Sequence, residues 1–158
     1  LSCTLVTIQE ISACSAYWNE TSLFNDTPAH IREFCRDAYQ DWGTDYIFIG
    51  GDDEWIPARE MDYAYESDVD SDIYWNHLDN TFNNDEDAFW GEEGDSGFDL
   101  YSEIYIGRIT CDEPQDVSNW MKKKNLVPNL LKEWVSWAYS VYICLKSMED
   151  REKIIFHY

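Results

Sequence analysis

The sequence predicts an α/β fold, a three-layer sandwich in which helices cover both faces of a mostly parallel β-sheet. The apolar run at residues 46–49 does not alternate with polar residues, which is typical of a central parallel strand covered on both faces. An amphipathic helix precedes this strand, and a β-favouring segment at Thr4–Ile8 precedes the helix. Strand, helix and strand in this order are most economically joined as a βαβ unit with parallel strands.

The helix before the central strand shows signals for both of its ends. Thr27 can cap it, Pro28 suits its first position, and Gly43 is well placed to end it. Apolar residues recur at helical spacing between these ends, so one face of the helix is expected to be buried. These residues are Ile31, Phe34, Cys35, Ala38, Tyr39 and Trp42.

A second strand-to-helix step follows later in the chain. Residues 101–110 form a β-favouring segment in which isoleucines are set among polar residues. Asp112 or Glu113 can cap a helix that begins near Pro114. The order strand, helix, strand, long loop, strand, helix fits the sandwich.

The formal charge of −21 is unevenly spread along the chain. Residues 1–120 include 28 acidic and 4 basic residues, whereas residues 121–158 include 4 acidic and 7 basic ones, so the net charge changes from −24 to +3. An acidic body repels phosphate backbones, which argues against nucleic acid as a partner and favours bound cations, salt adaptation or solubility.

Three acids, Asp52, Asp53 and Glu54, follow the central strand after two glycines. In open α/β sheets the functional crevice lies outside the carboxyl ends of the strands, where these carboxylates would fall. A solvated loop is the alternative explanation of the same residues.

The segment from Asp52 to Glu103 holds 18 acids and one base, and its many aromatic residues argue against disorder. Ordering so many like charges is unfavourable unless cations neutralise them. Calcium suits an irregular loop because it takes about six to eight oxygen ligands, although neither acidic run here has the full EF-hand pattern. The predicted calcium ligands are Asp68, Asp70, Asp72, Asp85 and Asp87. A hydrated acidic surface is the alternative.

The five cysteines form no CxxC pair and no zinc-type cluster with histidine, and their odd number leaves at least one thiol unpaired. Cys35 occupies an apolar position of a helix and is expected to be a small core residue. His30 is expected on a helix surface. For His77 a structural role is favoured over a catalytic one.

Four segments of the chain together carry a family resemblance. They are the helix at residues 31–43, Gly50-Gly51-Asp52 with Ile56-Pro57, the step Ser71-Asp72-Ile73-Tyr74, and the strand at residues 103–109. In order, spacing and residue type they resemble the amino-terminal half of the gingipain-like cysteine peptidases. The resemblance covers Thr4 to Lys123. Its most specific part is the Gly-Asp and Ile-Pro pair combined with Ile-Gly-Arg.

This resemblance implies a caspase-like fold with calcium-supported loops, a secreted or cell-surface location, and hydrolysis of protein or peptide substrates by a cysteine paired with a histidine. Both of those residues lie downstream in the family, so the carboxyl-terminal half is expected to be missing and the chain to be inactive alone. Glu103 resembles the acid that supports the histidine in some members. Its carboxylate could instead only close the acidic loop. A non-catalytic calcium-binding or adhesion module is the alternative function.

Residues 124–158 are expected to form a divergent or aberrant tail, separate from the peptidase-like part at residues 1–123. The charge changes and the family pattern stops at the lysine run that ends at Lys124, which suggests a truncation or a reading-frame slip. Helical spacing from Leu131 to Leu145 predicts an amphipathic helix, too interrupted to span a membrane. Deleting residues 125–158 is therefore expected to cost little stability. The start at Leu1 rather than Met also indicates a fragment.

Overall fold

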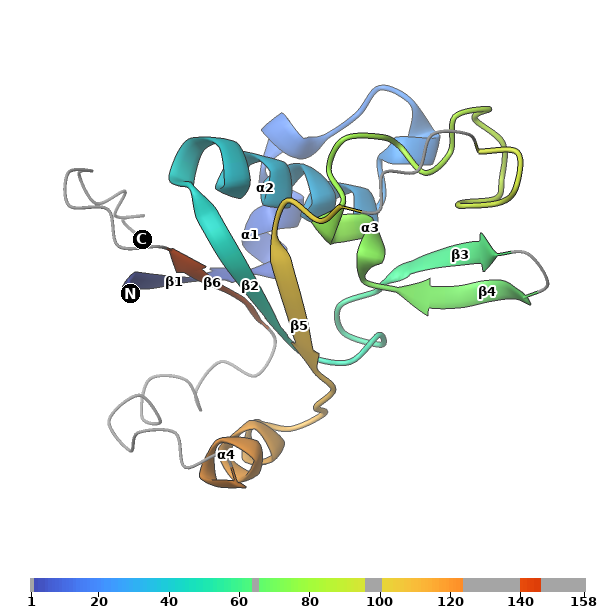
Figure 1. Ribbon diagram of the computed structural model, residues 1–158. Helices are drawn as coiled ribbons and strands as arrows, with labels where there is room; N and C mark the ends of the chain where they lie inside the picture. The colour runs from blue at the N-terminus through green and yellow to red at the C-terminus, as the bar shows by residue number, and fades with distance from the viewer. Residues whose placement is uncertain (1, 64–65, 96–100, 124–139, 146–158) are drawn as a thin grey trace.

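The computed structural model describes residues 2–63, 66–95, 101–123 and 140–145. Its main sheet has four strands in the order β1, β6, β2, β5, and β3 and β4 form a separate two-stranded sheet (Figure 1). The strands are β1 (Ser2–Thr7), β2 (Thr44–Gly50), β3 (Arg59–Tyr63), β4 (Glu66–Ser71), β5 (Tyr105–Ile109) and β6 (Ser140–Leu145). The described part is a mixed α/β structure.

The helices that the sequence predicts at residues 27–43 and from Pro114 lie close to those positions. They are α1 (Ile8–Ala13), α2 (Thr27–Trp42), α3 (Ile73–Asn76) and α4 (Pro114–Lys123), with short 3-10 turns at Ser15–Tyr17 and Ser22–Phe24. The cap of α2 is Asp26 and not Thr27 as predicted, because the Asp26 carboxylate accepts the backbone N–H of Ala29 at 3.0 Å. Gly43 ends α2 as predicted, with a φ of +64° in the left-handed region.

Strand β1 ends where α1 begins. The strand predicted at Thr4–Ile8 is found at Ser2–Thr7, and Ile8 already belongs to α1, a helix that the sequence analysis does not predict. Thr7 Oγ1 accepts the N–H of Glu10 at 3.2 Å, and the Glu10 carboxylate accepts the N–H of Thr7 at 2.7 Å. This reciprocal capping box fixes the transition from strand to helix.

Apolar residues of β2 pack against other residues on both of its faces, fully buried on one face and partly buried on the other. Ile47 and Ile49 belong to the large core cluster that includes the apolar face of α2. Phe48, which lies between them in the strand, packs instead with Trp120 of α4, with 5.6 Å between the ring centroids. The strand lacks polar alternation because both of its faces are covered, as predicted, although Tyr46 at its start remains half exposed.

The mostly parallel sheet predicted from the sequence is wrong for the described strands, because β6 enters the sheet antiparallel. Strands β2 and β5 pair in parallel, as predicted. Strand β6 lies between β1 and β2 and is antiparallel to both. Strands β1 and β2 consequently run in the same direction without being neighbours, so the βαβ interpretation had their direction right and missed the strand between them.

Residues 140–145 form a strand where the sequence spacing predicts the end of a helix. The β-branched residues Val141 and Ile143 favour an extended chain. In addition, β6 forms backbone hydrogen bonds with a strand on each side, and a helix at this position could not form them. Residues 131–139, the remainder of the predicted helix, lie outside the described residues. The domain boundary at residue 123 stays a prediction.

Deletion of residues 125–158 separates the two interpretations of the tail. The sequence alone predicts a small loss of stability, whereas the sheet predicts a large one, because the deletion removes the strand that joins β1 to β2. We expect the shortened chain to unfold at a lower urea concentration and with a smaller m-value, followed by far-ultraviolet circular dichroism. A chain ending at Leu145 is the control and should unfold like the full chain. An unchanged transition in the shorter variant would contradict the place of β6.

Candidate functional site

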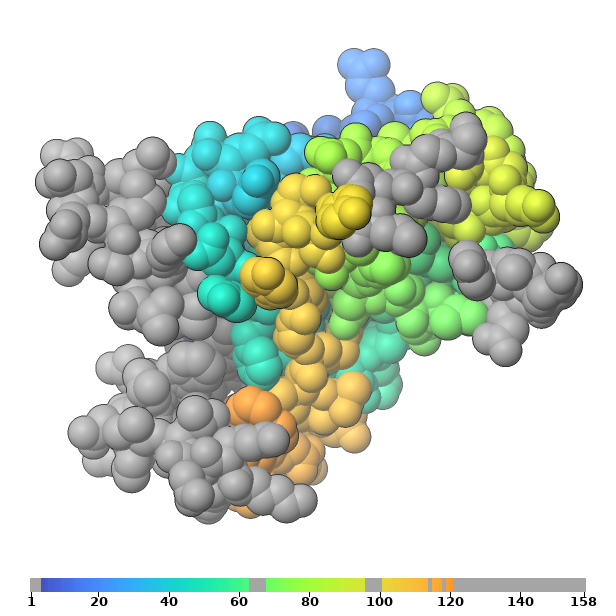
Figure 2. All heavy atoms as spheres, viewed as in Figure 1, coloured from blue at the N-terminus to red at the C-terminus, as the bar shows by residue number. Residues whose placement is uncertain are grey.

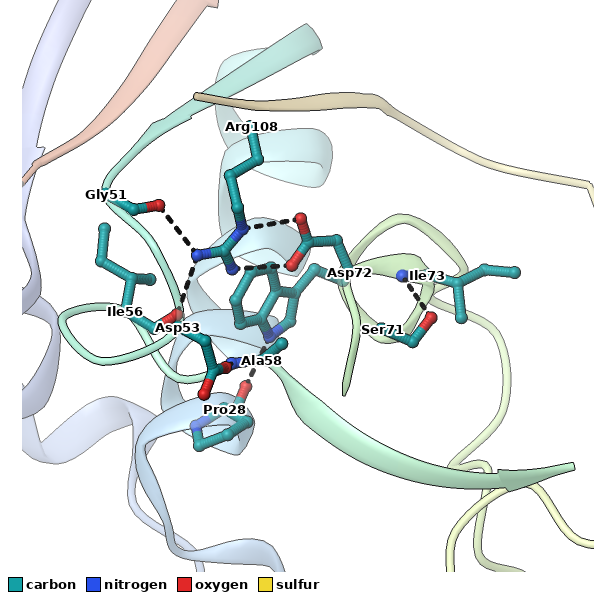
Figure 3. Close-up of polar contacts among 10 residues, drawn as sticks. Pro28, Gly51, Asp53, Ile56, Ala58, Ser71, Asp72, Ile73 and Arg108 are labelled. Atoms are coloured by element: carbon teal, nitrogen blue, oxygen red, sulfur yellow. Dashed lines mark hydrogen bonds and ion pairs between the residues drawn. The ribbon is translucent and has the colours of Figure 1, made fainter. Parts of the chain in front are cut away.

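Arg108 on β5 is the centre of a hydrogen-bonded node beside the carboxyl ends of β2 and β5 (Figure 3). Its guanidinium binds the Asp72 carboxylate as a bidentate fork, with Nε to Oδ2 at 2.9 Å and Nη2 to Oδ1 at 2.7 Å. Its Nη1 donates to the carbonyl oxygens of Gly51 and Ile56, both at 3.0 Å. The Arg108 side chain is 12% exposed, so little water competes for these charge-assisted bonds.

The node joins three segments that lie far apart in the sequence: the turn after β2, the residue before α3, and β5. Trp75 of α3 extends it, since the Arg108 guanidinium carbon lies 5.4 Å from the Trp75 ring centroid. The Trp75 indole is fully buried, and its Nε1 donates to the carbonyl of Pro28 at 2.9 Å. The start of α2 is thereby attached to the same node.

Acids that follow β2 and β5 meet at this edge of the sheet. Asp52 follows β2 and Asp112 follows β5, and a hydrogen bond with the Asp52 carboxyl raises the pKa of Asp112. Asp53 points to its own turn instead, where its carboxylate accepts the N–H of Ala58 at 2.6 Å. The sequence places Asp52 and Asp53 at the edge, but it does not show that Asp112 pairs with Asp52, because that contact depends on the parallel register of the two strands.

Glu103, the predicted catalytic residue, forms one hydrogen bond with the last residue of α3 and one with the segment after it. Its Oε2 accepts the N–H of Leu78 at 2.6 Å, and its own N–H donates to the carbonyl of Asn76 at 3.0 Å. His77, between these two residues, is 5% exposed. The contacts agree with the loop-closing alternative. A carboxylate can accept further hydrogen bonds, so support of a histidine by Glu103 stays a prediction.

The buried cysteines are poorly suited to act as nucleophiles. Burial raises the pKa of the Cys35 thiol well above its ordinary value, and burial together with the charge of Asp116 raises that of Cys111. A nucleophilic cysteine needs the opposite, a lowered pKa and an adjacent base. The described histidines, His30 and His77, contact oxygen atoms of neighbouring residues at 2.8 and 3.2 Å. These placements agree with core and structural roles for Cys35 and His77.

Three acids in the loop after α3 form a cluster suited to a metal ion. Asp85, Asp87 and Glu92 each bring one carboxylate oxygen within 4.8 Å of the others. Asp85 and Asp87 are predicted ligands. Glu92 is not, because it follows Asp87 by five residues and lies outside the alternating acidic pattern.

The other predicted ligands lie elsewhere. Asp68 and Asp70 are exposed on β4 and are not part of this cluster. Both carboxylate oxygens of Asp72 accept hydrogen bonds from Arg108. In the alternating run at residues 68–72, the first two acids therefore lie on a strand and the third forms an ion pair. The acids that form a cluster are those of residues 85–92.

The loop at residues 78–95, yellow-green in Figure 2, is ordered by hydrogen bonds of its own. Buried Asn83 forms two hydrogen bonds with Asp87. The Asn83 Nδ2 donates to the Asp87 carbonyl at 3.0 Å, and the Asp87 N–H donates to Asn83 Oδ1 at 3.1 Å. Buried Asp95 accepts the N–H of Gly91 at 2.9 Å. Gly91 has a φ of +80°, in the left-handed region that favours glycine, and a Cβ there would lie 2.8 Å from Cε at the flexible end of Met61.

Two further arginines hold this loop against α2. Arg59 forms a fork with Asp26 at 2.6 and 2.8 Å, and its guanidinium carbon lies 3.8 Å from the centroid of Trp90. Arg32 is 3% exposed and donates to the carbonyl of His77 at 2.7 Å and to the carbonyl of Asn80 in the loop. Backbone groups of the loop are thus bonded to a rigid helix.

Like charges remain close together in the acidic cluster. Desolvation raises the pKa of Glu92, and the charges of Asp87 and Asp85 raise it further. A carboxyl whose pKa is higher in the folded than in the unfolded state lowers stability as the pH rises through that range. The ionised cluster therefore opposes folding at neutral pH, and a bound cation would offset this effect.

The sequence model of Peptidase family C25 matches residues 1–144. The chain belongs to peptidase family C25. The resemblance to the gingipain-like peptidases is thereby confirmed, and the match continues past Lys123 into the residues of β6. Comparisons with curated proteins and with solved structures give no match.

The motifs that carry the C25 resemblance are one physical unit in the structure. Arg108 of Ile-Gly-Arg donates to Gly51 of Gly-Gly-Asp, to Ile56 of Ile-Pro and to Asp72 of Ser-Asp-Ile-Tyr. The spacing of these motifs therefore reflects a set of hydrogen bonds. Within the residues that the structure describes, no helix of this C25 chain is long and apolar enough to cross a membrane.

Asp72→Asn tests the node of this C25 chain. The substitution keeps the shape of the side chain but turns one acceptor of the fork into a donor that faces the guanidinium. We expect it to lower the free energy of unfolding in urea by about 3 kcal/mol, because a largely buried charge loses its partner. Glu33→Gln is the matched control in the exposed Arg36–Glu33 pair and should cost less than about 0.5 kcal/mol. Equal small losses would show that the node is not central to the fold.

Proposed function

We propose that the chain is part of the catalytic domain of a secreted cysteine endopeptidase with a caspase-like, three-layer α/β/α arrangement. Membership of family C25 supports peptide-bond hydrolysis as the reaction and proteins or peptides as the substrates. The Arg108 node carries the proposal, because it holds the turns at the carboxyl ends of parallel strands, where open α/β sheets bind their ligands. Burial of β2 by α2 and α4 on opposite faces supports the three layers.

In this proposal the cysteine nucleophile and its histidine come from a carboxyl-terminal half of the domain that this chain does not include. The raised pKa values of Cys35 and Cys111 support this division, since neither thiol would ionise readily at neutral pH. Glu103 acts as a positioning residue for the incoming histidine, and its bond from Leu78 holds the carboxylate in place. The chain alone is inactive.

Calcium bound to Asp85, Asp87 and Glu92 stabilises the acidic loop in this proposal. The donor set fits the ion, since three carboxylates supply oxygen ligands and calcium accepts further carbonyl or water oxygens in an irregular geometry. The raised pKa of Glu92 supports it as well, because a cation would remove the repulsion that raises it. Asp68 and Asp70 form a second, separate candidate for calcium on β4.

Thermal unfolding with calcium and with a chelator tests the metal proposal. Calcium at a free concentration a hundredfold above its Kd should stabilise the folded chain by about 2.7 kcal/mol and raise its melting temperature. Asp85→Asn combined with Asp87→Asn should abolish the shift. The pair Asp68→Asn and Asp70→Asn is the matched control and should keep it. Identical melting temperatures for the unsubstituted chain would rule out calcium, and loss of the shift only in the control pair would move the site to β4.

A peptidase assay tests the division of the catalytic machinery. The chain alone, with calcium and a reductant, should cleave neither a peptide library nor an unfolded protein, because neither buried thiol is activated. Cleavage abolished by Cys35→Ala or Cys111→Ala would place the nucleophile in this chain.

A non-catalytic binding module is the second candidate, favoured by Phe89, which is 51% exposed in the acidic loop. It shares the expectation that the chain alone is inactive. The two differ for a longer gene product that includes the downstream sequence. Hydrolysis by that product supports the peptidase, whereas calcium binding without hydrolysis supports the module.

A further inference from the structure

Two cysteines lie directly opposite each other in the main sheet. Cys3 on β1 and Cys144 on β6 are Cα partners in the antiparallel ladder. Opposed residues of antiparallel strands have Cα atoms about 4.5–5.5 Å apart and lie on the same face of the sheet. Disulfide-bonded cysteines have Cα separations of about 4.4–6.8 Å. We propose that Cys3 and Cys144 form a disulfide bond that joins β1 to β6.

The remaining cysteines do not compete for this pairing. Cys35 belongs to the large core cluster beside α2, and Cys111 belongs to the smaller cluster beside α4. Cys14 follows α1. In the described ladders none of these three is opposite another cysteine. With five cysteines in the chain, one bond leaves three thiols, in agreement with the odd count.

The row of the sheet that contains this pair is exposed to solvent at its other two positions, on β2 and β5. The register places Cys3, Cys144, Tyr46 and Tyr105 in one row across the four strands, on one face of the sheet. Tyr46 and Tyr105 are 51% and 67% exposed, and their rings stack with centroids 5.2 Å apart. The face that carries the row is thus open to solvent at its β2 and β5 positions.

Formation of the bond requires a disulfide-containing oxidant, such as glutathione disulfide. The thiolate of one cysteine attacks the oxidant and releases one reduced thiol, which leaves a mixed disulfide. The thiolate of the second cysteine then attacks the mixed disulfide at the protein sulfur, so the S–S bond of the protein forms and a second reduced thiol leaves. Two electrons pass to the oxidant, and the two cysteine protons are taken up by the released thiols. The bond would persist in an oxidising compartment.

Such a bond connects residues near the two ends of the described chain. It closes a loop of most of the chain length, and long loops lose the most conformational freedom in the unfolded state. It also holds β6 between β1 and β2, the two strands that β6 joins. Oxidation should therefore raise the urea midpoint of unfolding relative to the reduced chain.

Peptide mapping of the full chain tests the proposal. The chain is folded with glutathione disulfide, its remaining thiols are alkylated, and it is digested without reduction by trypsin and a glutamate-specific peptidase. We expect residues 1–10, which contain Cys3 but not Cys14, to be linked to residues 134–146, which contain Cys144. The linked species should weigh two hydrogen atoms less than its parts and separate on reduction.

Variants provide the controls. Cys144→Ser should remove the link and make the urea midpoint independent of oxidation. Cys14→Ser should keep the link and the rise of the urea midpoint on oxidation. A link that involves Cys14, Cys35 or Cys111, or alkylation of all five thiols after oxidation, would overturn the proposal. The map of the unsubstituted chain decides the matter even if a variant fails to fold. None of these results depends on peptidase activity or on calcium.

Discussion

The arrangement of the described segments depends on a guanidinium that is largely removed from water. Arg108 lies on β5, and its guanidinium binds acceptors of two other segments, the turn after β2 and the residue before α3. A buried charge that loses a partner is strongly destabilising, so these segments have to be in place together. The turn after β2, the entry to α3 and β5 therefore behave as one unit. That unit sets the edge of the sheet where Asp52 and Asp112 meet.

The other arginines of the acidic residues 1–120 likewise bind separate chain segments together. The four basic residues of the first 120 are Arg32, Arg36, Arg59 and Arg108, and each of them donates to a carbonyl or a carboxylate in the described structure. They bind chain segments together more than they neutralise acids, because several of their acceptors are uncharged carbonyls. The acidic loop is thus ordered from the inside by arginines, while its outward carboxylates still repel one another. This separation of tasks explains why a loop with so much like charge can be ordered and can still favour a cation.

Local sequence signals were sufficient to predict the positions of α2 and β2. The proline and glycine at the ends of α2 and the uninterrupted apolar run of β2 placed both elements, and they favoured parallel strands, which β2 and β5 are. What the sequence could not show depends on distant partners. An isolated segment such as residues 140–145 satisfies helical spacing as well as an extended chain, and only its two ladders decide between them. Asp72 likewise has the spacing of a calcium ligand, and its actual partner lies 36 residues away.

The two ends of the sheet are held by different means, and this has a consequence for the site. The row of Cys3, Cys144, Tyr46 and Tyr105 lies near the start of β2, whereas the Arg108 node lies beside its end. Five residues of extended chain separate Tyr46 from Gly51, a distance of roughly 16 Å. A covalent link in that row would restrain the strands without touching the turns that the node organises. Non-covalent contacts then hold the carboxyl edge, so the loops there can adjust to a ligand while the far end of the sheet stays fixed.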